Sequence, residues 1–362
     1  EANDDLDLLA DVASHEPTDL LEATDDAPII RLVNSMLQHA VKERASDIHI
    51  EPFEEELRIR YRIDGVLHDV ETAPKKLQAA IVSRVKIMAR CDVAERRLPQ
   101  DGAIDLEMSG RTVRLRVSIL PTATGERIVL RVLDKEILVF DLGKLGFSSD
   151  DTEKIDRALR QPEGMVLVGG PKGAGAKSTL YSFIGRLHSP ETCVLTAENP
   201  IDFDFDGVGQ VQVKEELGYT YAAALAAFLQ QDPDVIMIQE LRDAEAANAA
   251  VQAAMDAALI LTSLTAEDTA AALAKLSAWG VPPTLLAAAA RLVISQRGIR
   301  SLCPHCKVEY TPMPDQLKRA GILNIGLKEI DGRSPAELTL FKPRGCERCA
   351  MTGYRGRLLV YE

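Results

Sequence analysis

Residues 164–182, GMVLVGGPKGAGAKSTLYS, constrain the fold more than any other part of the chain. They read as a buried strand, a glycine-rich loop and the start of a helix, the arrangement that cradles phosphate groups on backbone N–H groups. The usual spacing is G-x-x-x-x-G-K-[ST], but here the lysine, Lys177, stands one position later. The stretch therefore predicts a phosphate-binding fold and leaves open whether the loop still binds a nucleotide.

The sequence around this loop predicts a parallel sheet covered by helices. Within residues 146–302, short apolar runs alternate with helical patterns; the runs are MVLV, CVLT, VIMI and LILTS. Strands that alternate with helices form doubly wound α/β sheets. We therefore expect one α/β domain over residues 146–302.

The preceding residues, 27–135, predict a small α+β domain. Apolar residues recur at helical spacing from Ile29 to Val41, after a proline suited to a first helical position. The run LRIRYRIDGVLHDV alternates apolar and polar residues about an Asp64-Gly65 turn, which predicts a hairpin. A second helix from Leu77 to Met88 and a second hairpin in VRLRVSILPTATGERIVLRVLD complete the domain. Residues 136–145 are then a linker.

Charge is concentrated at the start of the chain. Residues 1–26 hold ten of the 55 acidic residues and none of the 42 basic ones. We interpret them as a flexible, solvated acidic arm; the alternative is that its paired leucines dock on a partner. The near-neutral remainder argues against nucleic-acid binding. No apolar run approaches the ~18 residues of a membrane span, no signal peptide is visible, and the absence of an initiating Met leads us to expect a fragment.

Four of the six cysteines form two C-x-x-C pairs, CPHC and CERC. Two such pairs present four thiolates tetrahedrally to Zn²⁺ and leave no open coordination position, which predicts a structural zinc subdomain over residues 303–362. The ligands are Cys303, Cys306, Cys346 and Cys349. A nucleic-acid-binding ribbon is the alternative, but nearby basic residues are few and lack interleaved aromatics. We expect His305 to face solvent.

Two further apolar runs end in carboxylates. VLTAENPIDF ends a strand at Glu198, with Asp202 nearby, and DPDVIMIQELRD places Glu240 where a carboxylate orients Mg²⁺ or water. A strand-end carboxylate is often only a cap. LILTSLTAEDTA is a further strand that leads into a polar loop. Three such strand ends on one sheet beside a glycine loop predict a nucleotide site, with Glu198 and Glu240 as candidate catalytic residues.

From Ala27 to Glu362 the chain resembles the ATPases of type II secretion and type IV pilus assembly, closest to the general secretory pathway protein E type. The stretches that carry the resemblance are DDAPIIRLVNSML, ASDIHIEPFE, RRLPQDG, GERIVLRVLD, QDPDVIMI, SLCPHCK and GYRGR. The resemblance implies a PAS-like N-terminal domain, a RecA-like P-loop domain, a tetracysteine zinc subdomain and a hexameric ring. Such a ring is cytoplasmic, sits on an inner-membrane secretion platform and drives pseudopilus assembly. The family's further N-terminal domain and its last C-terminal helices have no counterpart in this sequence.

The resemblance also implies a set of nucleotide-binding residues. In the loop and the following helix these are Gly170, Gly173, Gly175, Lys177, Ser178 and Thr179. Arginines of the family's N-terminal domain reach a phosphate across a domain or subunit boundary. The corresponding residues here are Arg116, Arg127 and Arg131.

The chain departs from the family most clearly in the loop. Aligned without gaps to G-P-T-G-S-G-K-S-T-T-L-Y, it has Ala176 at the phosphate-binding lysine and Lys177 at the Mg²⁺-ligating hydroxyl. An alternative register makes Lys177 the functional lysine and Ser178 the Mg²⁺ ligand. Without a compensating deletion, that register rotates Leu180 and Tyr181 by about 100° on the helix. We favour the ungapped register.

At other motifs of the family, this chain has residues that lack the family's charge or change the local backbone geometry. The aspartate of the Asp box is Asn199, the glycine before the Walker-B glutamate is Gln239, and the two histidines of the His box are Ala258 and Thr265. The helix before QDPD has Ala and Gln where the family has arginines, and the late QRL motif reads QRG at residues 296–298.

These losses lead to one favoured hypothesis and two alternatives. We favour a hydrolysis-impaired motor subunit, a pseudo-ATPase in a homo-hexamer or in a mixed ring with active paralogues. It holds structural Zn²⁺ and has weakened or lost binding of ATP and Mg²⁺. The first alternative is an active ATPase that uses Lys177 and Ser178 in the shifted register. The second, a nucleic-acid-binding RecA-like module, fits neither the charge nor the aromatic content.

Overall fold

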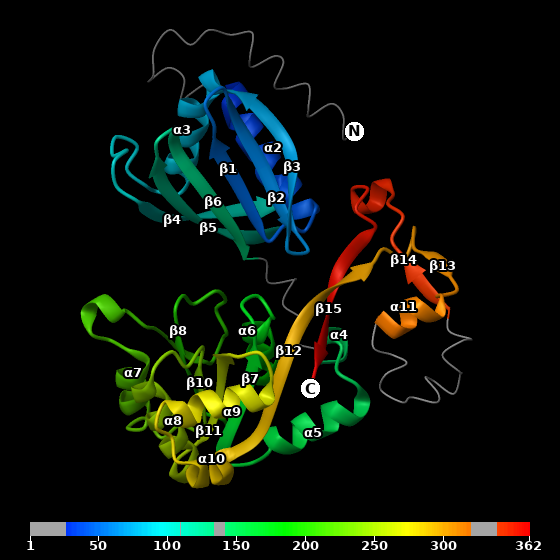
Figure 1. Ribbon diagram of the computed structural model, residues 1–362. Coiled ribbons are helices and arrows are strands. Elements are labelled where there is room, and N and C mark those ends of the chain that lie inside the picture. The colour runs from blue at the N-terminus through cyan, green and yellow to red at the C-terminus, as the bar shows by residue number, and fades with distance from the viewer. Residues whose placement is uncertain (1–26, 109, 134–141, 320–338) are drawn as a thin grey trace. The chain divides into compact units, whose positions relative to one another are not determined.

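The computed structural model describes residues 27–108, 110–133, 142–319 and 339–362. The chain divides into two compact parts, residues 1–138 and 139–362, which we call the N-terminal unit and the C-terminal unit and describe separately (Figure 1). The expected acidic arm, residues 1–26, and residues 136–141 of the expected linker lie outside the described residues. No helix in the described ranges has the length and apolar character needed to cross a bilayer.

The N-terminal unit is built on one antiparallel sheet of six strands in the order β3-β2-β1-β6-β5-β4. The expected first hairpin is confirmed: β2 pairs with β3 around Asp64 and Gly65, which have φ of 49° and 85°. The second hairpin, β5 with β6, is confirmed too. The strands are β1 (Asp47–Pro52), β2 (Glu56–Ile63), β3 (Val66–Pro74), β4 (Gln100–Met108), β5 (Arg111–Thr122) and β6 (Gly125–Leu133).

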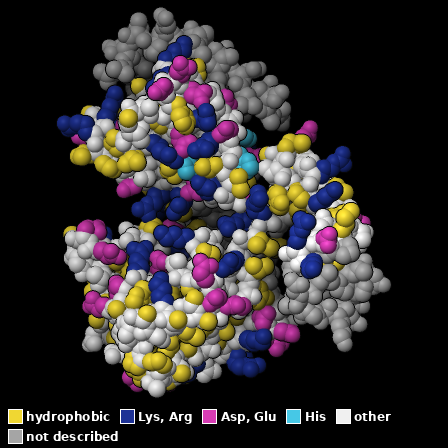
Figure 2. Space-filling view, viewed as in Figure 1, with side chains coloured by type: hydrophobic (Ala, Val, Ile, Leu, Met, Phe, Trp, Pro, Cys, Tyr) yellow, Lys and Arg dark blue, Asp and Glu magenta, His cyan; other side chains and the backbone are white. Residues whose placement is uncertain are grey.

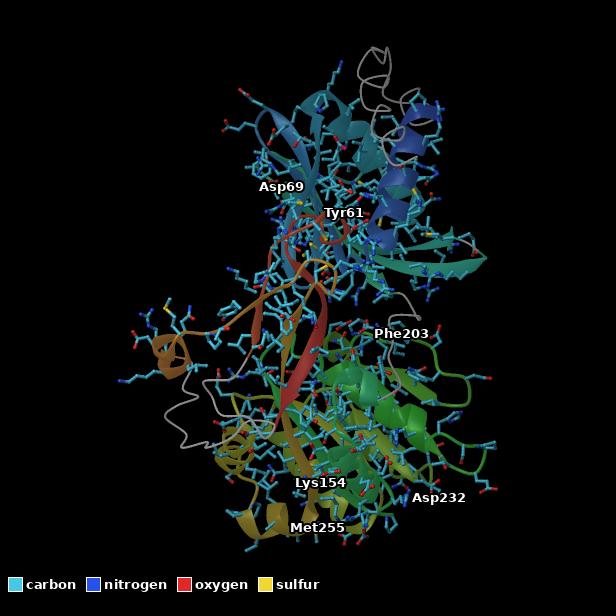
Figure 3. All side chains as sticks on the ribbon, turned by 90° about the vertical axis from the view of Figure 1, so that its right-hand side faces the viewer. Tyr61, Asp69, Lys154, Phe203, Asp232 and Met255 are labelled. Atoms are coloured by element: carbon cyan, nitrogen blue, oxygen red, sulfur yellow. The ribbon has the colours of Figure 1, made fainter. Side chains whose placement is uncertain are left out.

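Two helices share a core with this sheet, as the periodicity predicts: α2 (Ala27–Lys42) and α3 (Gln78–Met88). Tyr61 of β2, labelled in Figure 3, is 2% exposed, and its hydroxyl donates to the backbone carbonyl of Met36 at 2.7 Å. This bond satisfies a buried phenol while tying helix to sheet. Burial raises the pKa of Tyr61 far above its ordinary value, so the hydroxyl stays a donor.

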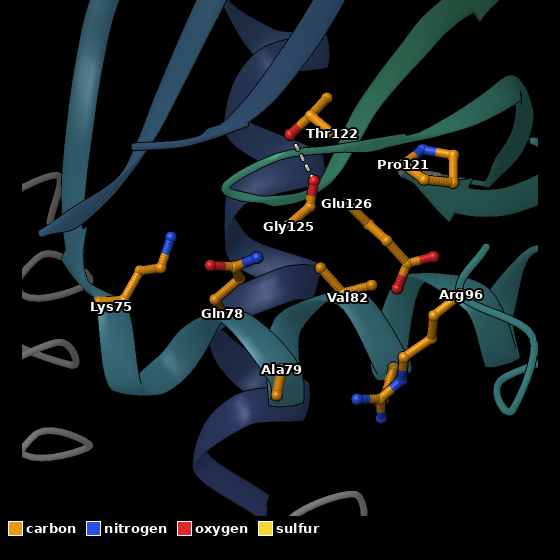
Figure 4. A pocket seen from close by; sticks show the side chains of 10 residues that line it. Lys75, Gln78, Ala79, Val82, Arg96, Pro121, Thr122, Gly125 and Glu126 are labelled. Carbon is orange, nitrogen blue, oxygen red and sulfur yellow. Dashed lines mark hydrogen bonds between the residues drawn. The ribbon is translucent and has the colours of Figure 1, made fainter. Parts of the chain in front are cut away.

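An ion pair lies inside the N-terminal unit. Lys86 of α3 is 1% exposed, and its ammonium lies 2.6 Å from the Glu126 carboxylate on β6 and 2.6 Å from the carbonyl oxygen of Glu95. Glu126 also lines a cavity of about 260 Å³ together with Lys75 and Arg96 (Figure 4). Lys75 donates to the carbonyls of Phe53 and Thr124. The buried pair therefore connects a helix, a strand and the segment that precedes β4.

The C-terminal unit contains a seven-stranded sheet in the order β15-β12-β7-β11-β10-β8-β9. The four apolar runs form β7, β8, β10 and β11, and β7, β11, β10 and β8 pair in parallel, so the predicted parallel sheet is confirmed. The strands are β7 (Gly164–Gly170), β8 (Val194–Glu198), β9 (Gly209–Gln212), β10 (Val235–Ile238), β11 (Leu259–Thr265), β12 (Ala290–Leu302) and β15 (Tyr354–Tyr361).

Helices pack on this sheet. Residues of α7 (Tyr221–Phe228), α8 (Ala244–Asp256) and α10 (Pro283–Ala289) share one core with alternate residues of β7 and β10. Helix α6 (Ala176–Leu187) contacts β7 and β11 outside that core, while α5 (Ser149–Leu159) and α9 (Thr269–Ala278) contact β12. A short α4 (Leu142–Leu145) precedes α5. Hydrophobic side chains gather on the surface over α8, α9 and α10 (Figure 2), where the sequence is rich in alanine.

The cysteine segment begins and ends on this sheet. Strand β12 runs parallel to β7 and then pairs antiparallel with β15, so the last residues assigned from sequence to the zinc subdomain form a strand of the C-terminal sheet. Between β12 and β15 lie a two-stranded sheet of β13 (Val308–Tyr310) and β14 (Leu340–Lys342), and the short helix α11 (Pro314–Arg319). Residues 320–338 are outside the described ranges.

The buried pair in the N-terminal unit gives a stability prediction. We expect Lys86→Met to destabilise this unit by ~3 kcal/mol, because it leaves the Glu126 carboxylate buried without its cation. The double variant Lys86→Met, Glu126→Leu should recover most of that loss. Urea unfolding of the full chain measures both. Arg97→Ala, which breaks the exposed pair with Glu95, is the control and should cost less than ~1 kcal/mol. A Lys86→Met variant as stable as the unmodified chain would refute the stabilising role.

Candidate functional site

The glycine-rich loop (residues 170–175) joins β7 to α6. At Gly170 an added Cβ would lie 2.4 Å from the carbonyl oxygen of Gln296, so only glycine fits between the two strands. Gly175 has φ of 87° and ends the loop as the N-cap of α6, which makes Ala176 the first helical residue. The strand, loop and helix predicted from the sequence therefore follow one another as expected.

Side chains from β12 and β15 hold this loop. Gln296 of β12 is fully buried; its Nε2 donates to the Ala174 carbonyl at 2.9 Å, and its Oε1 accepts from the Thr179 hydroxyl at 3.0 Å. Arg357 of β15 donates from Nη2 to the Gly173 carbonyl at 3.2 Å. Our sequence interpretation noted Gln296 only as part of a changed motif and missed this role, because the contact joins segments more than a hundred residues apart.

Lys177, the displaced lysine, points to the end of β8. Its ammonium donates to the Asp202 carboxylate at 2.7 Å and to the Pro200 carbonyl at 2.6 Å, and lies 3.4 Å from the Glu198 carboxylate. Its side chain is 20% exposed. We call Lys177, Glu198 and Asp202 the lysine cluster. The hydrogen bonds place Lys177 against the acidic end of β8, on acceptors supplied by this chain.

Glu198 is completely buried and its two carboxylate oxygens are shared among several donors. Oε1 accepts from the Thr196 hydroxyl and the Gln210 amide, both at 2.9 Å, and Oε2 accepts from the Tyr181 hydroxyl. Burial, followed by the charge of Glu198, raises the pKa of Tyr181 far above its ordinary value, so this hydroxyl is a permanent donor. The aromatic rings of Phe203 (labelled in Figure 3) and Phe205 pack on Tyr181.

Glu240 follows β10 at the same sheet edge. Its Oε1 accepts from the Thr265 hydroxyl at 2.8 Å, and its Oε2 accepts from Arg242 at 3.2 Å. The neighbouring Gln239 bridges to the end of β8, since its Oε1 accepts from the Asn199 backbone N–H at 2.6 Å. Gln239 and Thr265 thus both make hydrogen bonds across the strand ends.

The remaining expected nucleotide-site residues fall into two groups. Ser178 and Thr179 lie in the first turn of α6, and Thr179 is fully buried. Arg127 and Arg131 lie on β6 of the N-terminal unit, paired with Glu51 at 2.5 Å and Asp47 at 3.0 Å. Arg116 lies opposite Arg131 on β5. The sequence interpretation did not foresee that buried carboxylates of β1 hold two of these arginines.

The four cysteines of the two C-x-x-C pairs come together, with all sulfur atoms within 4.8 Å of one another. Three of the sulfur–sulfur distances are 3.9, 3.8 and 3.7 Å. A tetrahedron with Zn–S bonds of ~2.3 Å has edges of about 3.8 Å, so the cluster fits Zn²⁺. His305 is exposed and contacts Arg348, so the expectation that it faces solvent is confirmed.

The hydrogen bonds of Cys349 favour a thiolate. Burial alone would raise the pKa of Cys349, but the backbone N–H groups of Cys346 and Gly353 donate to its sulfur at 3.2 Å, and the pKa falls to about 6. A metal-binding thiol needs this deprotonated form at neutral pH.

Comparison with known proteins decides the family. The family model described as "Type II/IV secretion system protein" matches residues 22–362. The chain belongs to this family. It is 43% identical over 344 residues to the type II secretion system protein E of Dickeya dadantii, covering 95% of this chain and 67% of that protein. It is also 43% identical over 362 residues to the type II secretion system ATPase E of Vibrio cholerae, covering 100% and 70%.

The X-ray structure of the Legionella pneumophila ATPase DotB shares the fold. It matches with a TM-score of 0.60 over 79% of each chain, at 22% identity. The resemblance to the secretion ATPases drawn from the sequence is therefore confirmed, and so is the mixed α/β ATPase fold.

The sulfur geometry of this secretion-family chain predicts one zinc ion per chain. We expect elemental analysis of purified protein to find about one zinc per chain, and Cys349→Ala to remove it because three thiolates hold Zn²⁺ far less tightly than four. Cys193→Ala is the matched control, since Cys193 lies outside the cluster. Zinc content well below one per chain in the unmodified protein would contradict the assignment.

Proposed function

We propose that this chain is a subunit of a secretion or pilus-assembly motor that does not hydrolyse ATP at a significant rate. The observation that carries the proposal is the placement of its two changed loop residues. Ala176 occupies the first position of α6, and the ammonium of Lys177 is bonded to Asp202 and Pro200. A loop of this kind needs a lysine beside the transferred phosphate, and neither residue supplies one.

The geometry of α6 supports the ungapped alignment on which this reasoning rests. Leu180 and Tyr181 are fully buried, and the Tyr181 hydroxyl donates to Glu198. The shifted register without a compensating deletion would turn both side chains by about 100° away from these contacts. Ala176 then occupies the position of the family's phosphate-binding lysine, and Lys177 occupies the position of its Mg²⁺-ligating hydroxyl residue.

The other replacements act in the same direction. Gln239 and Asn199 bond to each other where the family has a glycine and an aspartate. Helix α7 carries alanines where the family carries arginines. A single arginine finger contributes ~10³–10⁵ in rate to phosphoryl transfer, so these losses together with that of the lysine leave hydrolysis near background.

The wider setting of the proposal follows the family. We place the chain in a hexameric ring, alone or mixed with active paralogues, at the cytoplasmic face of an inner-membrane secretion platform. The antiparallel sheet with α2 and α3 supports a PAS-like N-terminal domain, and the cluster of four cysteines supports a structural zinc. The backbone N–H groups at the start of α6 still attract anions, so weak nucleotide binding through the glycine-rich loop remains part of the proposal.

An active ATPase is the second candidate, favoured by one observation: the similar protein of Vibrio cholerae is named an ATPase. In this version Lys177 contacts the phosphates and Ser178 holds Mg²⁺. Lys177 would have to leave Asp202 and Pro200, both of which it contacts within 2.7 Å.

Turnover separates the two candidates. We expect purified protein with ATP and Mg²⁺ to release phosphate at least ~10³-fold more slowly than an active family member measured beside it, because the phosphate-binding lysine and arginines are missing. Lys177→Ala should leave that low rate unchanged. Turnover comparable to the active relative, abolished by Lys177→Ala, would overturn the proposal and establish the second candidate.

A further inference from the structure

The acidic end of β8 does not fit Mg²⁺ as the chain folds. Mg²⁺ requires an octahedral set of oxygen ligands at 2.0–2.1 Å, usually one or two carboxylates with phosphate oxygens and water. Glu198 is fully buried, and both its oxygens accept hydrogen bonds from Thr196, Gln210 and Tyr181. The Glu198 oxygens cannot also bind a hydrated Mg²⁺ ion unless several of these hydrogen bonds break.

The chain itself places a positive charge between the two carboxylates at this position and offsets part of their negative charge. The Lys177 ammonium lies 2.7 Å from Asp202 and 3.4 Å from Glu198, between the two carboxylates. Of the three donor hydrogens of the ammonium, two are donated to Asp202 and to the Pro200 carbonyl, and Glu198 is an ion-pair partner at 3.4 Å. A divalent cation beside the same carboxylates would be repelled at short range by the ammonium.

We infer that Lys177 is a built-in cation that replaces Mg²⁺, so that this site takes phosphate-bearing ligands without a metal. The inference rests on the proposed function, because it assumes the ungapped register. It goes further in assigning Lys177 a role: one positive charge of the protein stands where the family binds a dissociable ion. A nucleotide then meets the glycine-rich loop as the free anion, with no dependence on divalent cations.

The contacts of Lys177 also link two parts of the C-terminal unit. Asp202 and Pro200 belong to the segment between β8 and β9, and the ammonium fastens that segment to the first turn of α6. Removing the ammonium exposes two carboxylates to each other with no counter-charge. A hydrated divalent cation held by Asp202 is then the natural replacement, because Mg²⁺ keeps several waters and needs only one or two carboxylates, and the nearby charge of Glu198 attracts it.

Thermal unfolding of the full, zinc-loaded chain, in buffer without added Mg²⁺ and in millimolar Mg²⁺, tests the replacement. We expect the Tm of the unmodified protein to be the same in both. Lys177→Ser should lower Tm in buffer without Mg²⁺, and added Mg²⁺ should then raise it by roughly 2–4 °C, a shift typical of a modest stabilisation in a domain of this size. Lys154→Ser is the control: this lysine also pairs with an aspartate, Asp151 at 2.8 Å, but is 65% exposed on α5. Mg²⁺ stabilisation of the unmodified protein, or none of Lys177→Ser, would overturn the inference.

Calorimetric titration with ATP separates this inference from the proposed function. ATP affinities within about twofold of each other without Mg²⁺ and in millimolar Mg²⁺ support it. An affinity at least about tenfold weaker without Mg²⁺ overturns it, yet leaves the proposed function standing if turnover is absent. If ATP binds in neither condition, the inference is also overturned, because the site then takes no phosphate-bearing ligand. Mg²⁺-dependent turnover overturns the proposed function and the inference together.

Discussion

The burial of the Glu198 carboxylate is the constraint around which the site is organised. A charged group fully removed from water is costly unless it is paired and hydrogen-bonded. Here Thr196, Gln210, Tyr181 and Lys177 all contribute, from β8, β9 and α6. Satisfying this one group fixes the orientation of α6 against the strand ends, and it keeps the Lys177 ammonium at the end of β8.

Polar side chains at the carboxyl edge of the C-terminal sheet form connected contacts in the structure. Gln239 bonds to the backbone of Asn199, and Thr265 donates to Glu240. Each of these side chains satisfies a polar group at this edge. Under the proposed function, the same contacts preserve the fold while lowering what the site can do for an incoming phosphate.

Much of the fold was predictable because it depends on local pattern. Alternation about Asp64-Gly65 and the apolar runs MVLV and VIMI determine strands directly, and paired C-x-x-C motifs determine the sulfur cluster. The site was predictable only in part. Glu198 and Glu240 were identified from their positions after apolar strands, but the partner of Lys177 depends on the path of the segment between β8 and β9. The return of β15 to the main sheet, which brings Arg357 to the loop, depends on a long-range pairing that no local pattern encodes.

The central claim is that the ammonium of Lys177 stands in the place of a divalent metal ion. The most direct measurement is the anomalous scattering of Mn²⁺ in crystals of the full chain grown with ATP and Mn²⁺. The account predicts no manganese peak at Glu198 and Asp202, with the Lys177 ammonium still in hydrogen-bond contact with Asp202. A manganese ion bound to these carboxylates, with Lys177 turned away toward the phosphates, would contradict it.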